Sequence, residues 1–231
     1  MLRALVFCLS AAAAQPATAQ DCAVELVLAM DVSRSVDAAE FGLIRHGTAE
    51  AFRRAEIIEL VGWLPGGVIA TVTQWSGADQ QMQAIGWRHL SGPESLGAFA
   101  DEIDAMTRHF RFELTAPGEA LAHAASLHDS APMACRRRVI DIAGDGIRNT
   151  GRDTAATADA IAADGVTING LVVRGDTPDP LDFYHTEIKR GALAFIEVSD
   201  GYDDFPRAMF RKLLRELTPS VSALPAIRRY E

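Results

Sequence analysis

Short apolar runs alternate along this chain with segments whose apolar residues recur at helical spacing. This alternation favours an α/β domain with a doubly wound, mostly parallel sheet. Ser76-Gly77-Ala78-Asp79 is turn-like and too short for a crossover helix, so the second and third strands should form a hairpin, with the third as an antiparallel edge. The predicted strands lie near residues 24–30, 67–75, 82–88, 137–143, 166–173 and 194–198, and the predicted helices near 38–61, 93–107, 117–129, 152–164, 180–190 and 204–217.

The first nineteen residues, 1–19, have the pattern of a secretory signal peptide. Arg3 precedes an apolar stretch, and Ala17-Thr18-Ala19 provides a small-residue cleavage site. The stretch is shorter than a bilayer span requires, which disfavours the alternative of a membrane anchor. We therefore expect a protein without membrane insertion that is periplasmic or secreted, with one domain over residues 20–218 and a C-terminal tail over 219–231.

Charge and cysteine content narrow the classes of partner and the compartment. The net charge of −9 argues against nucleic acid or an anionic membrane as the main partner. Two cysteines follow the signal segment, Cys22 and Cys135, each just upstream of an apolar strand pattern. An even pair in an oxidising compartment favours a disulfide, and two buried free thiols are the alternative.

Oxygen-bearing side chains follow the first predicted strand at alternating positions, as Asp31, Ser33 and Ser35. Groups spaced in this way can converge on one point, and hard divalent cations such as Mg2+ take oxygen ligands. Two further oxygen-bearing residues occupy comparable places, Thr115 in a loop before a predicted helix and Asp145 after a buried strand. Taken alone, Thr115 is a candidate helix cap and Asp145 a candidate turn residue.

Together these five residues resemble the metal-ion-dependent adhesion site (MIDAS) of the von Willebrand factor type A family. The resemblance covers about residues 24–217, and the segment 139–146 is similar to that of a bacterial exported branch of the family whose function is undefined. Asp31, Ser33 and Ser35 match the Asp-x-Ser-x-Ser element, Thr115 matches the lone threonine, and Asp145 matches the aspartate of the Asp-Gly turn.

The resemblance implies the strand order 3-2-1-4-5-6, with the metal at the carboxyl ends of strands 1 and 4, where the order reverses. It also implies where the cysteines lie. Cys22 comes nine residues before Asp31, and Cys135 comes ten residues before Asp145. Counting back along two parallel neighbouring strands places both sulfur atoms at the opposite edge of the sheet, within reach of a disulfide.

The function implied by the resemblance is binding and not catalysis. Ser33 and Ser35 would bind a cation directly, and their neutral hydroxyls would leave its charge under-compensated, so that an Asp or Glu carboxylate of a protein partner could complete the coordination. The cation could be Mg2+, Mn2+ or Ca2+. Ala38 and Ala39 stand where some relatives carry two acidic residues for a second metal, so one metal site is expected.

Two alternatives remain open from the sequence. A phosphatase with an aspartate nucleophile also begins from a strand ending in aspartate, but it needs a second carboxylate two residues later, where this chain has Ser33. An accessory subunit could use the same five residues for a purely structural metal.

Asp141 departs from the family pattern, which usually places an aliphatic residue at that point of the strand. A buried carboxylate needs a partner if it is ionised. Arg137, Thr71 and Thr73 are the candidate partners.

Overall fold

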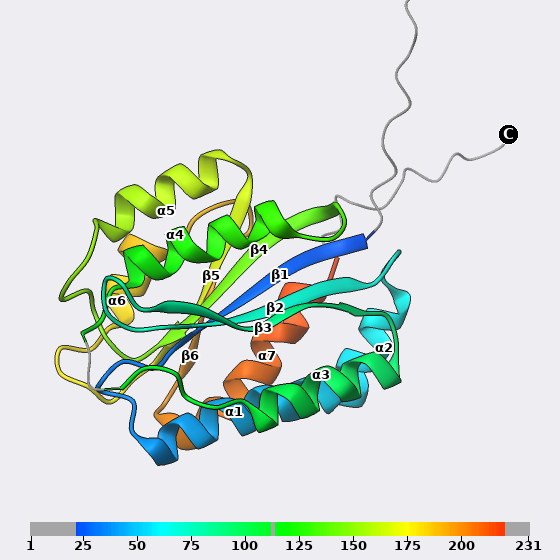
Figure 1. Ribbon diagram of the computed structural model, residues 1–231, viewed down its shortest axis with the longest axis horizontal. Coiled ribbons are helices and arrows are strands. Elements are labelled where there is room, and N and C mark those ends of the chain that lie inside the picture. The colour runs from blue at the N-terminus through cyan, green and yellow to red at the C-terminus, as the bar shows by residue number, and fades with distance from the viewer. Residues whose placement is uncertain (1–21, 112–113, 220–231) are drawn as a thin grey trace, which may run out of the picture.

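The computed structural model describes residues 22–111 and 114–219, which form a six-stranded sheet between two layers of helices (Figure 1). The strand order is β3-β2-β1-β4-β5-β6, and every neighbouring pair is parallel except β2 and β3, which are antiparallel. The doubly wound sheet, its antiparallel edge and the implied strand order are therefore confirmed. The strands are β1 (Cys22–Asp31), β2 (Val68–Trp75), β3 (Gln81–Leu90), β4 (Cys135–Gly144), β5 (Val166–Val173) and β6 (Ile196–Ser199).

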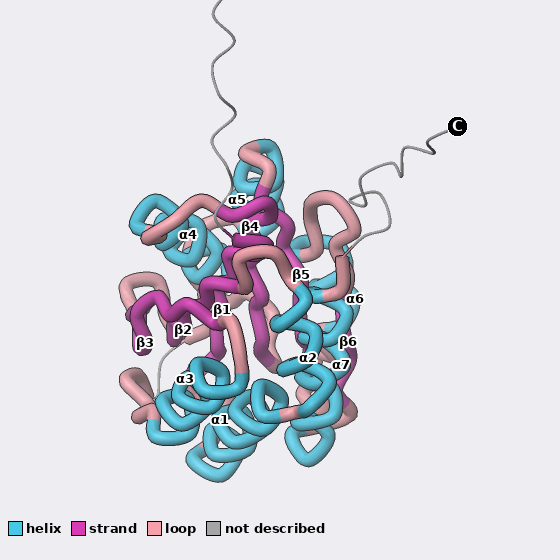
Figure 2. The backbone as a smooth tube through the Cα atoms, turned by 90° about the vertical axis from the view of Figure 1, so that its right-hand side faces the viewer, coloured by secondary structure: helices cyan, strands magenta, loops and turns pink. Residues whose placement is uncertain are grey.

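Helices cover both faces of the sheet (Figure 2). One face packs against α1 (Ala38–Arg53), α2 (Ala55–Trp63), α3 (Pro93–Ala105) and α7 (Phe205–Leu217). The other packs against α4 (Pro117–Leu127), α5 (Thr154–Ala163) and the short α6 (Leu181–Phe183), which continues into a π-helical turn, η2 (Tyr184–Ile188). Two 3-10 turns, η1 (His128–Ser130) and η3 (Tyr202–Asp204), complete the elements. No helix within these described ranges is long and apolar enough to cross a membrane. The predicted signal peptide at residues 1–19, and the tail beyond Pro219, lie outside them.

The central strand β1 explains why the sheet needs helices on both sides. All ten of its residues are buried. Leu26, Leu28 and Met30 face the core under α1, α3 and α7, whereas Val27 and Ala29 face the core under α4 and α5. Alternate side chains of a strand point to opposite faces, so a strand that is buried at every position must be covered on both faces.

The first helical segment differs from its prediction. Asp37 caps α1 by accepting hydrogen bonds from the backbone of Ala39 at 2.7 Å and Glu40 at 2.8 Å, as the local sequence indicates. The predicted single helix over 38–61 is, however, two helices separated at Arg54, whose backbone is extended. No glycine or proline marks this break. It redirects α2 so that its apolar face, with Ile57, packs into the core.

A disulfide joins the starts of β1 and β4. Cys22 and Cys135 are direct partners in the parallel register, with their Cα atoms 4.5 Å apart. The predicted bridge is confirmed. It lies at the amino ends of these strands, whereas Asp31 ends β1 at the other edge of the sheet.

Asp141 has a partner that the sequence prediction missed. The Lys212 ammonium on α7 lies 2.6 Å from Asp141 Oδ1 and 3.4 Å from Glu216 Oε1, and all three side chains are almost completely buried. Burial, together with the charge of the Glu216 carboxylate, raises the pKa of Asp141 to about 7 despite the nearby lysine.

The candidate partners Arg137, Thr71 and Thr73 were wrong. Both threonine hydroxyls donate to backbone carbonyls of β3, at 2.6 Å and 2.9 Å. Arg137 instead donates to the backbone carbonyl of Glu216 at 2.9 Å. Lys212 on α7 reaches the middle of β4 and pairs with Asp141, whereas the two threonine hydroxyls form hydrogen bonds across the β2–β3 hairpin.

Candidate metal centre

The structure brings the five predicted residues together at the carboxyl ends of β1 and β4. The Ser33 and Ser35 hydroxyl oxygens lie 3.3 Å apart. The Ser35 hydroxyl donates to Asp145 Oδ1 at 2.8 Å, and the Thr115 hydroxyl donates to Ser33 Oγ at 3.4 Å. Of these residues only Ser35 is exposed, so the cluster opens to solvent on its side.

Asp31 supplies the deepest oxygen of the cluster. Its Oδ1 accepts the backbone N–H of Ser33 at 2.7 Å, while its Oδ2 is buried without a hydrogen-bond partner among the described residues. Burial, together with the negative charge of Asp145, raises the pKa of Asp31 from its usual 3.8 to about 8. The side chains of Asp31 and Asp145 therefore repel each other when both are ionised, because the nearby positive charge does not compensate for both.

The unpartnered oxygen of Asp31 points toward Gly144 and Tyr184. A Cβ atom on Gly144 would come within 2.7 Å of both Asp31 Oδ2 and the Tyr184 hydroxyl, so a larger residue here would displace these two side chains. The Tyr184 hydroxyl is also buried without a partner among the described residues. Burial raises the pKa of Tyr184 well above 10, and the neighbouring carboxylates reinforce the shift, so this hydroxyl stays protonated.

Thr115 is held in place by its backbone and not by a helix-capping contact. Its N–H donates to the Asn149 side-chain oxygen at 2.8 Å, and the Asn149 N–H donates back to the Thr115 carbonyl at 3.1 Å. The residue that caps α4 is Ala116, and it makes no side-chain capping bond. The helix-cap interpretation of Thr115 is therefore wrong, and its hydroxyl is free to face Ser33.

Arg108 supports the Asp-x-Ser-x-Ser loop from the adjoining segment, a role that sequence reasoning missed. Its Nη2 donates to the carbonyls of Val32 at 2.9 Å and Ser33 at 2.8 Å. The guanidinium thus fixes the backbone from which the two serine hydroxyls project. Burial lowers the pKa of Arg108, and the positive charge of Arg111 adds to this.

Tyr202 holds the other end of the cluster and was also missed. Its hydroxyl donates to Asp145 Oδ2 at 2.8 Å, so both oxygens of Asp145 accept hydrogen bonds. Burial raises the pKa of Tyr202, and the charge of Asp145 adds to the shift, which keeps the hydroxyl protonated as a donor. Tyr202 follows Gly201, whose φ of 91° lies in the left-handed region that favours glycine.

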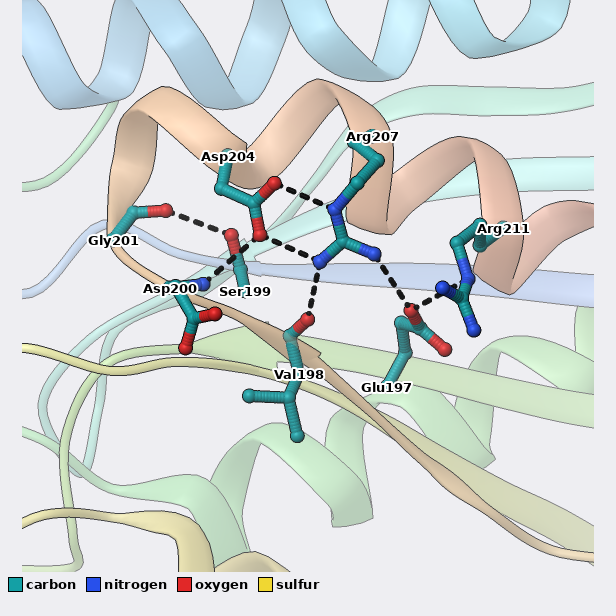
Figure 3. Close-up of polar contacts among 8 residues, drawn as sticks. All are labelled: Glu197, Val198, Ser199, Asp200, Gly201, Asp204, Arg207 and Arg211. Atoms are coloured by element: carbon teal, nitrogen blue, oxygen red, sulfur yellow. Dashed lines mark hydrogen bonds and ion pairs between the residues drawn. The ribbon is translucent and has the colours of Figure 1, made fainter.

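The turn that presents Tyr202 is braced by a fork of hydrogen bonds (Figure 3). Arg207 on α7 donates to Asp204 Oδ1 at 2.6 Å and to the carbonyl of Val198 at 2.9 Å. The backbone N–H of Asp200 donates to Asp204 Oδ2 at 3.0 Å. The Arg207 guanidinium lowers the pKa of Asp204 to about 2, so the brace stays ionised at neutral pH.

Pockets of opposite character flank the cluster. A cavity of about 390 Å3 on the side of β6 is bordered by acidic residues. A second cavity, of about 550 Å3, lies beside the loop that follows β1, and its border includes four arginines and one acidic residue, Asp37. The acidic residues are Glu40, Asp145, Asp176 and Asp203, and the arginines are Arg34, Arg45, Arg108 and Arg111.

The donors at this site are unlike those of a carboxylate or histidine cage. Within the ranges that the structure describes, no group of three or more His, Cys, Asp or Glu side chains is placed to hold a metal ion. The oxygens available to a cation are the hydroxyls of Ser33, Ser35 and Thr115, with the carboxylates of Asp31 and Asp145 beside them.

Comparison with known protein families identifies the family to which this chain belongs. Residues 21–221 match a family described as "Protein of unknown function (DUF1194)". The chain belongs to the DUF1194 family. No curated protein matches this DUF1194 chain.

Solved structures share the fold of the DUF1194 chain at low sequence identity. Proximal thread matrix protein 1 from the mussel byssus, in a structure with a zinc-occupied MIDAS motif, has a TM-score of 0.60 and 17% identity over 85% of this chain and 46% of its own. The PilB minor pilin from Streptococcus sanguinis has a TM-score of 0.64 and 12% identity, covering 91% and 65%. A von Willebrand factor type A protein from Catenulispora acidiphila has a TM-score of 0.55 and 16% identity, covering 84% and 42%.

These likenesses establish a von Willebrand factor type A-like fold for the DUF1194 chain. The chain spans less than two thirds of the length of each of the three proteins. What the larger proteins do therefore bears on this chain only as a proposal.

Proposed function

We propose that this protein is a divalent-metal-dependent binding domain that captures an Asp or Glu carboxylate of a protein partner. The observation that carries the proposal is the meeting of oxygens from separate loops: Ser35 Oγ lies 2.8 Å from Asp145 Oδ1, and Thr115 Oγ1 lies 3.4 Å from Ser33 Oγ. These residues are far apart in sequence, and no packing or capping need explains why their polar atoms converge.

The spacing of the oxygens fits a small hard cation. Mg2+ binds oxygens at about 2.0–2.1 Å in an octahedron, so neighbouring ligands lie about 3 Å apart. The separations of 2.8, 3.3 and 3.4 Å within the cluster bracket this value. A cation would also neutralise the repulsion between Asp31 and Asp145 and give the unpartnered Asp31 Oδ2 a positive neighbour, directly or through a coordinated water.

Different residues of the site would have different roles in binding the cation. The hydroxyls of Ser33, Ser35 and Thr115 are neutral donors, and Asp31 and Asp145 would orient coordinated waters or bind weakly. Arg108 fixes the serine loop through two backbone carbonyls, and the cation would supply the affinity for an incoming carboxylate. We propose Mg2+, Mn2+ or Ca2+ as the resident ion, at one site, because Ala38 and Ala39 provide no second set of ligands.

The surroundings favour a macromolecular partner over a small anion. Ser35 borders the acidic cavity, and its chain neighbours Arg34 and Val36 border the cavity that contains the four arginines. A carboxylate that coordinates the cation would therefore have acidic residues on one side and arginines on the other. A protein partner can carry charges that complement both groups.

Export would bring the site to such a partner. The disulfide between Cys22 and Cys135 suits an oxidising compartment. We propose residues 1–19 as the signal peptide, residues 20–218 as the binding domain and residues 219–231 as a tail.

A phosphatase is disfavoured by the geometry around Asp31. Its side chain is buried, the residue two positions later is the buried Ser33, and both oxygens of the neighbouring Asp145 already accept hydrogen bonds. Among the residues that the structure describes, no carboxylate stands ready as a general acid for a nucleophilic Asp31.

A retention experiment tests the proposed function. Immobilised wild type and Ser35→Ala are incubated with envelope extract in Mg2+ or in chelator, and the retained proteins are compared. We expect the wild type to retain partner proteins in Mg2+ and to lose them in chelator, and we expect Ser35→Ala to retain none of them. Free acidic peptide should elute the retained partners. A metal that raises the melting temperature without affecting retention would instead indicate the structural role of an accessory subunit.

A further inference from the structure

A separate cavity lies at the opposite end of the sheet from the candidate metal centre. It has a volume of about 560 Å3, within the range of small-molecule sites. Its walls come from the starts of β4 and β5, the loop before β6 and the end of α7. Four arginines line it: Arg136, Arg137, Arg138 and Arg215.

These four arginines have no carboxylate partner among the described residues, although most arginines elsewhere on the described surface form ion pairs, as Arg88 does with Glu102 at 2.8 Å. Their contacts leave their charge uncompensated. Arg137 and Arg138 donate to backbone carbonyls, and the Arg215 guanidinium lies 4.0 Å from the centroid of the Phe195 ring. Four guanidinium groups without a carboxylate partner around one cavity make it attractive to anions, even in a chain with a net charge of −9.

The acidic group nearest this cavity is already engaged. Glu216 lies in the inner wall, and its Oε1 accepts a hydrogen bond from Asn169 at 2.7 Å and lies 3.4 Å from the Lys212 ammonium. Because Glu216 is buried behind the arginines, the open part of the cavity presents mainly positive charge. A guanidinium binds phosphate or carboxylate through two parallel hydrogen bonds, so the natural ligand is an anion.

The rim of the cavity has an apolar feature that points to the rest of the ligand. Leu193 is 76% exposed, and its φ of 61° is the only positive value at a non-glycine residue in the described ranges. This backbone conformation is unfavourable for a leucine, and the side chain is largely unshielded. Ala192 and Ala194 flank it, which leaves a small apolar shelf next to the arginines.

We propose that this cavity binds an organic anion whose phosphate or carboxylate group lies against the arginines and whose apolar chain covers Leu193. The site is separate from the candidate metal centre and does not depend on the function proposed for it. Arg136 and Arg215 are exposed and available to the ligand, whereas Arg137 and Arg138 are half-buried and donate to backbone carbonyls.

Calorimetric titration of the purified protein in buffer free of divalent cations tests the proposal. The probes are octyl phosphate and octanoate, which distinguish phosphate from carboxylate, with inorganic phosphate as the probe that lacks an apolar chain. We expect saturable binding of at least one alkyl anion, one per chain, and weaker binding of inorganic phosphate. No saturable binding of either alkyl anion would overturn the proposal.

Three variants locate the binding. The double variant Arg136→Gln, Arg215→Gln should weaken the alkyl anion about tenfold or more, because it loses charge-assisted contacts. Leu193→Asn tolerates the positive φ and should lower alkyl-anion affinity toward that of inorganic phosphate, without changing the affinity for inorganic phosphate itself. Arg88→Gln, an exposed arginine outside the cavity, should change nothing. Equal affinities in wild type and the double variant, or an equal loss in Arg88→Gln, would overturn the proposal.

Discussion

Ser35 donates a hydrogen bond to Asp145 at 2.8 Å across 110 residues of sequence. The strand order makes this contact possible, because β1 and β4 are parallel neighbours with Met30 opposite Ala143. The loop after β1 and the turn after β4 therefore emerge side by side. This is the topological switch point, where open α/β sheets place their ligand sites.

Tyr202→Phe should weaken divalent-cation binding about tenfold, because Asp145 Oδ2 would lose the hydroxyl that orients it. Isothermal titration with Mn2+ measures the effect. The substitution removes one oxygen from a packed ring, so the melting temperature should change little. An unchanged Mn2+ affinity would show that Asp145 needs no support from Tyr202.

Replacing both Cys22 and Cys135 with alanine should lower the free energy of unfolding by about 2–4 kcal/mol, since the bridge spans 113 residues and constrains the unfolded chain. Urea unfolding measures the loss. Cation affinity should stay unchanged, because the bridge lies at the opposite end of β1 from Asp31. Two reactive thiols in the unreduced, exported protein would contradict the disulfide itself.

Lys212→Met should destabilise the fold by about 3–5 kcal/mol, because Asp141 and Glu216 would lose the buried cation between them. Lys189→Met is the matched control at a position without a carboxylate partner among the described residues, and it should cost no more than about 0.5 kcal/mol. Urea unfolding of the two variants gives the comparison. Equal losses would mean that Lys212 contributes only packing.

Asp141 should make stability depend on pH. Its pKa is about 7 in the folded chain, above its usual 3.8, because it is buried beside Glu216. The folded state therefore holds this proton more tightly than the unfolded state, and the stability that the protonated group contributes is lost as pH rises from about 4 to about 7. Relative to Asp141→Asn, the wild type should lose stability between about pH 4 and about pH 7, and the difference should then level off. A constant or rising difference in urea unfolding would contradict the shift.

Much of the site could be predicted because its residues follow strands. Asp31 and Asp145 come directly after buried apolar runs, and such runs reveal where parallel strands end. Arg108 and Tyr202 could not be found in this way, because they reach the site from irregular segments whose approach depends on tertiary packing.

The sequence contains a weak signal for the buried lysine, Lys212. Lys212 lies three residues after Met209 and one before Leu213, on the apolar face of an otherwise amphipathic helix. A charge at such a position indicates a buried partner, here Asp141. The break at Arg54 left no comparable signal, because no glycine or proline accompanies it.

The most direct measurement of the central claim is a Mn2+ titration followed by electron paramagnetic resonance, which separates free from bound ion. Wild type should bind one Mn2+ per chain, and excess Mg2+ should displace it. The double variant Ser33→Ala, Ser35→Ala should bind none while keeping its disulfide and its cooperative unfolding. Wild type that binds no Mn2+, or a double variant that binds it equally well, would contradict a metal centre built from Asp31, Ser33, Ser35, Thr115 and Asp145.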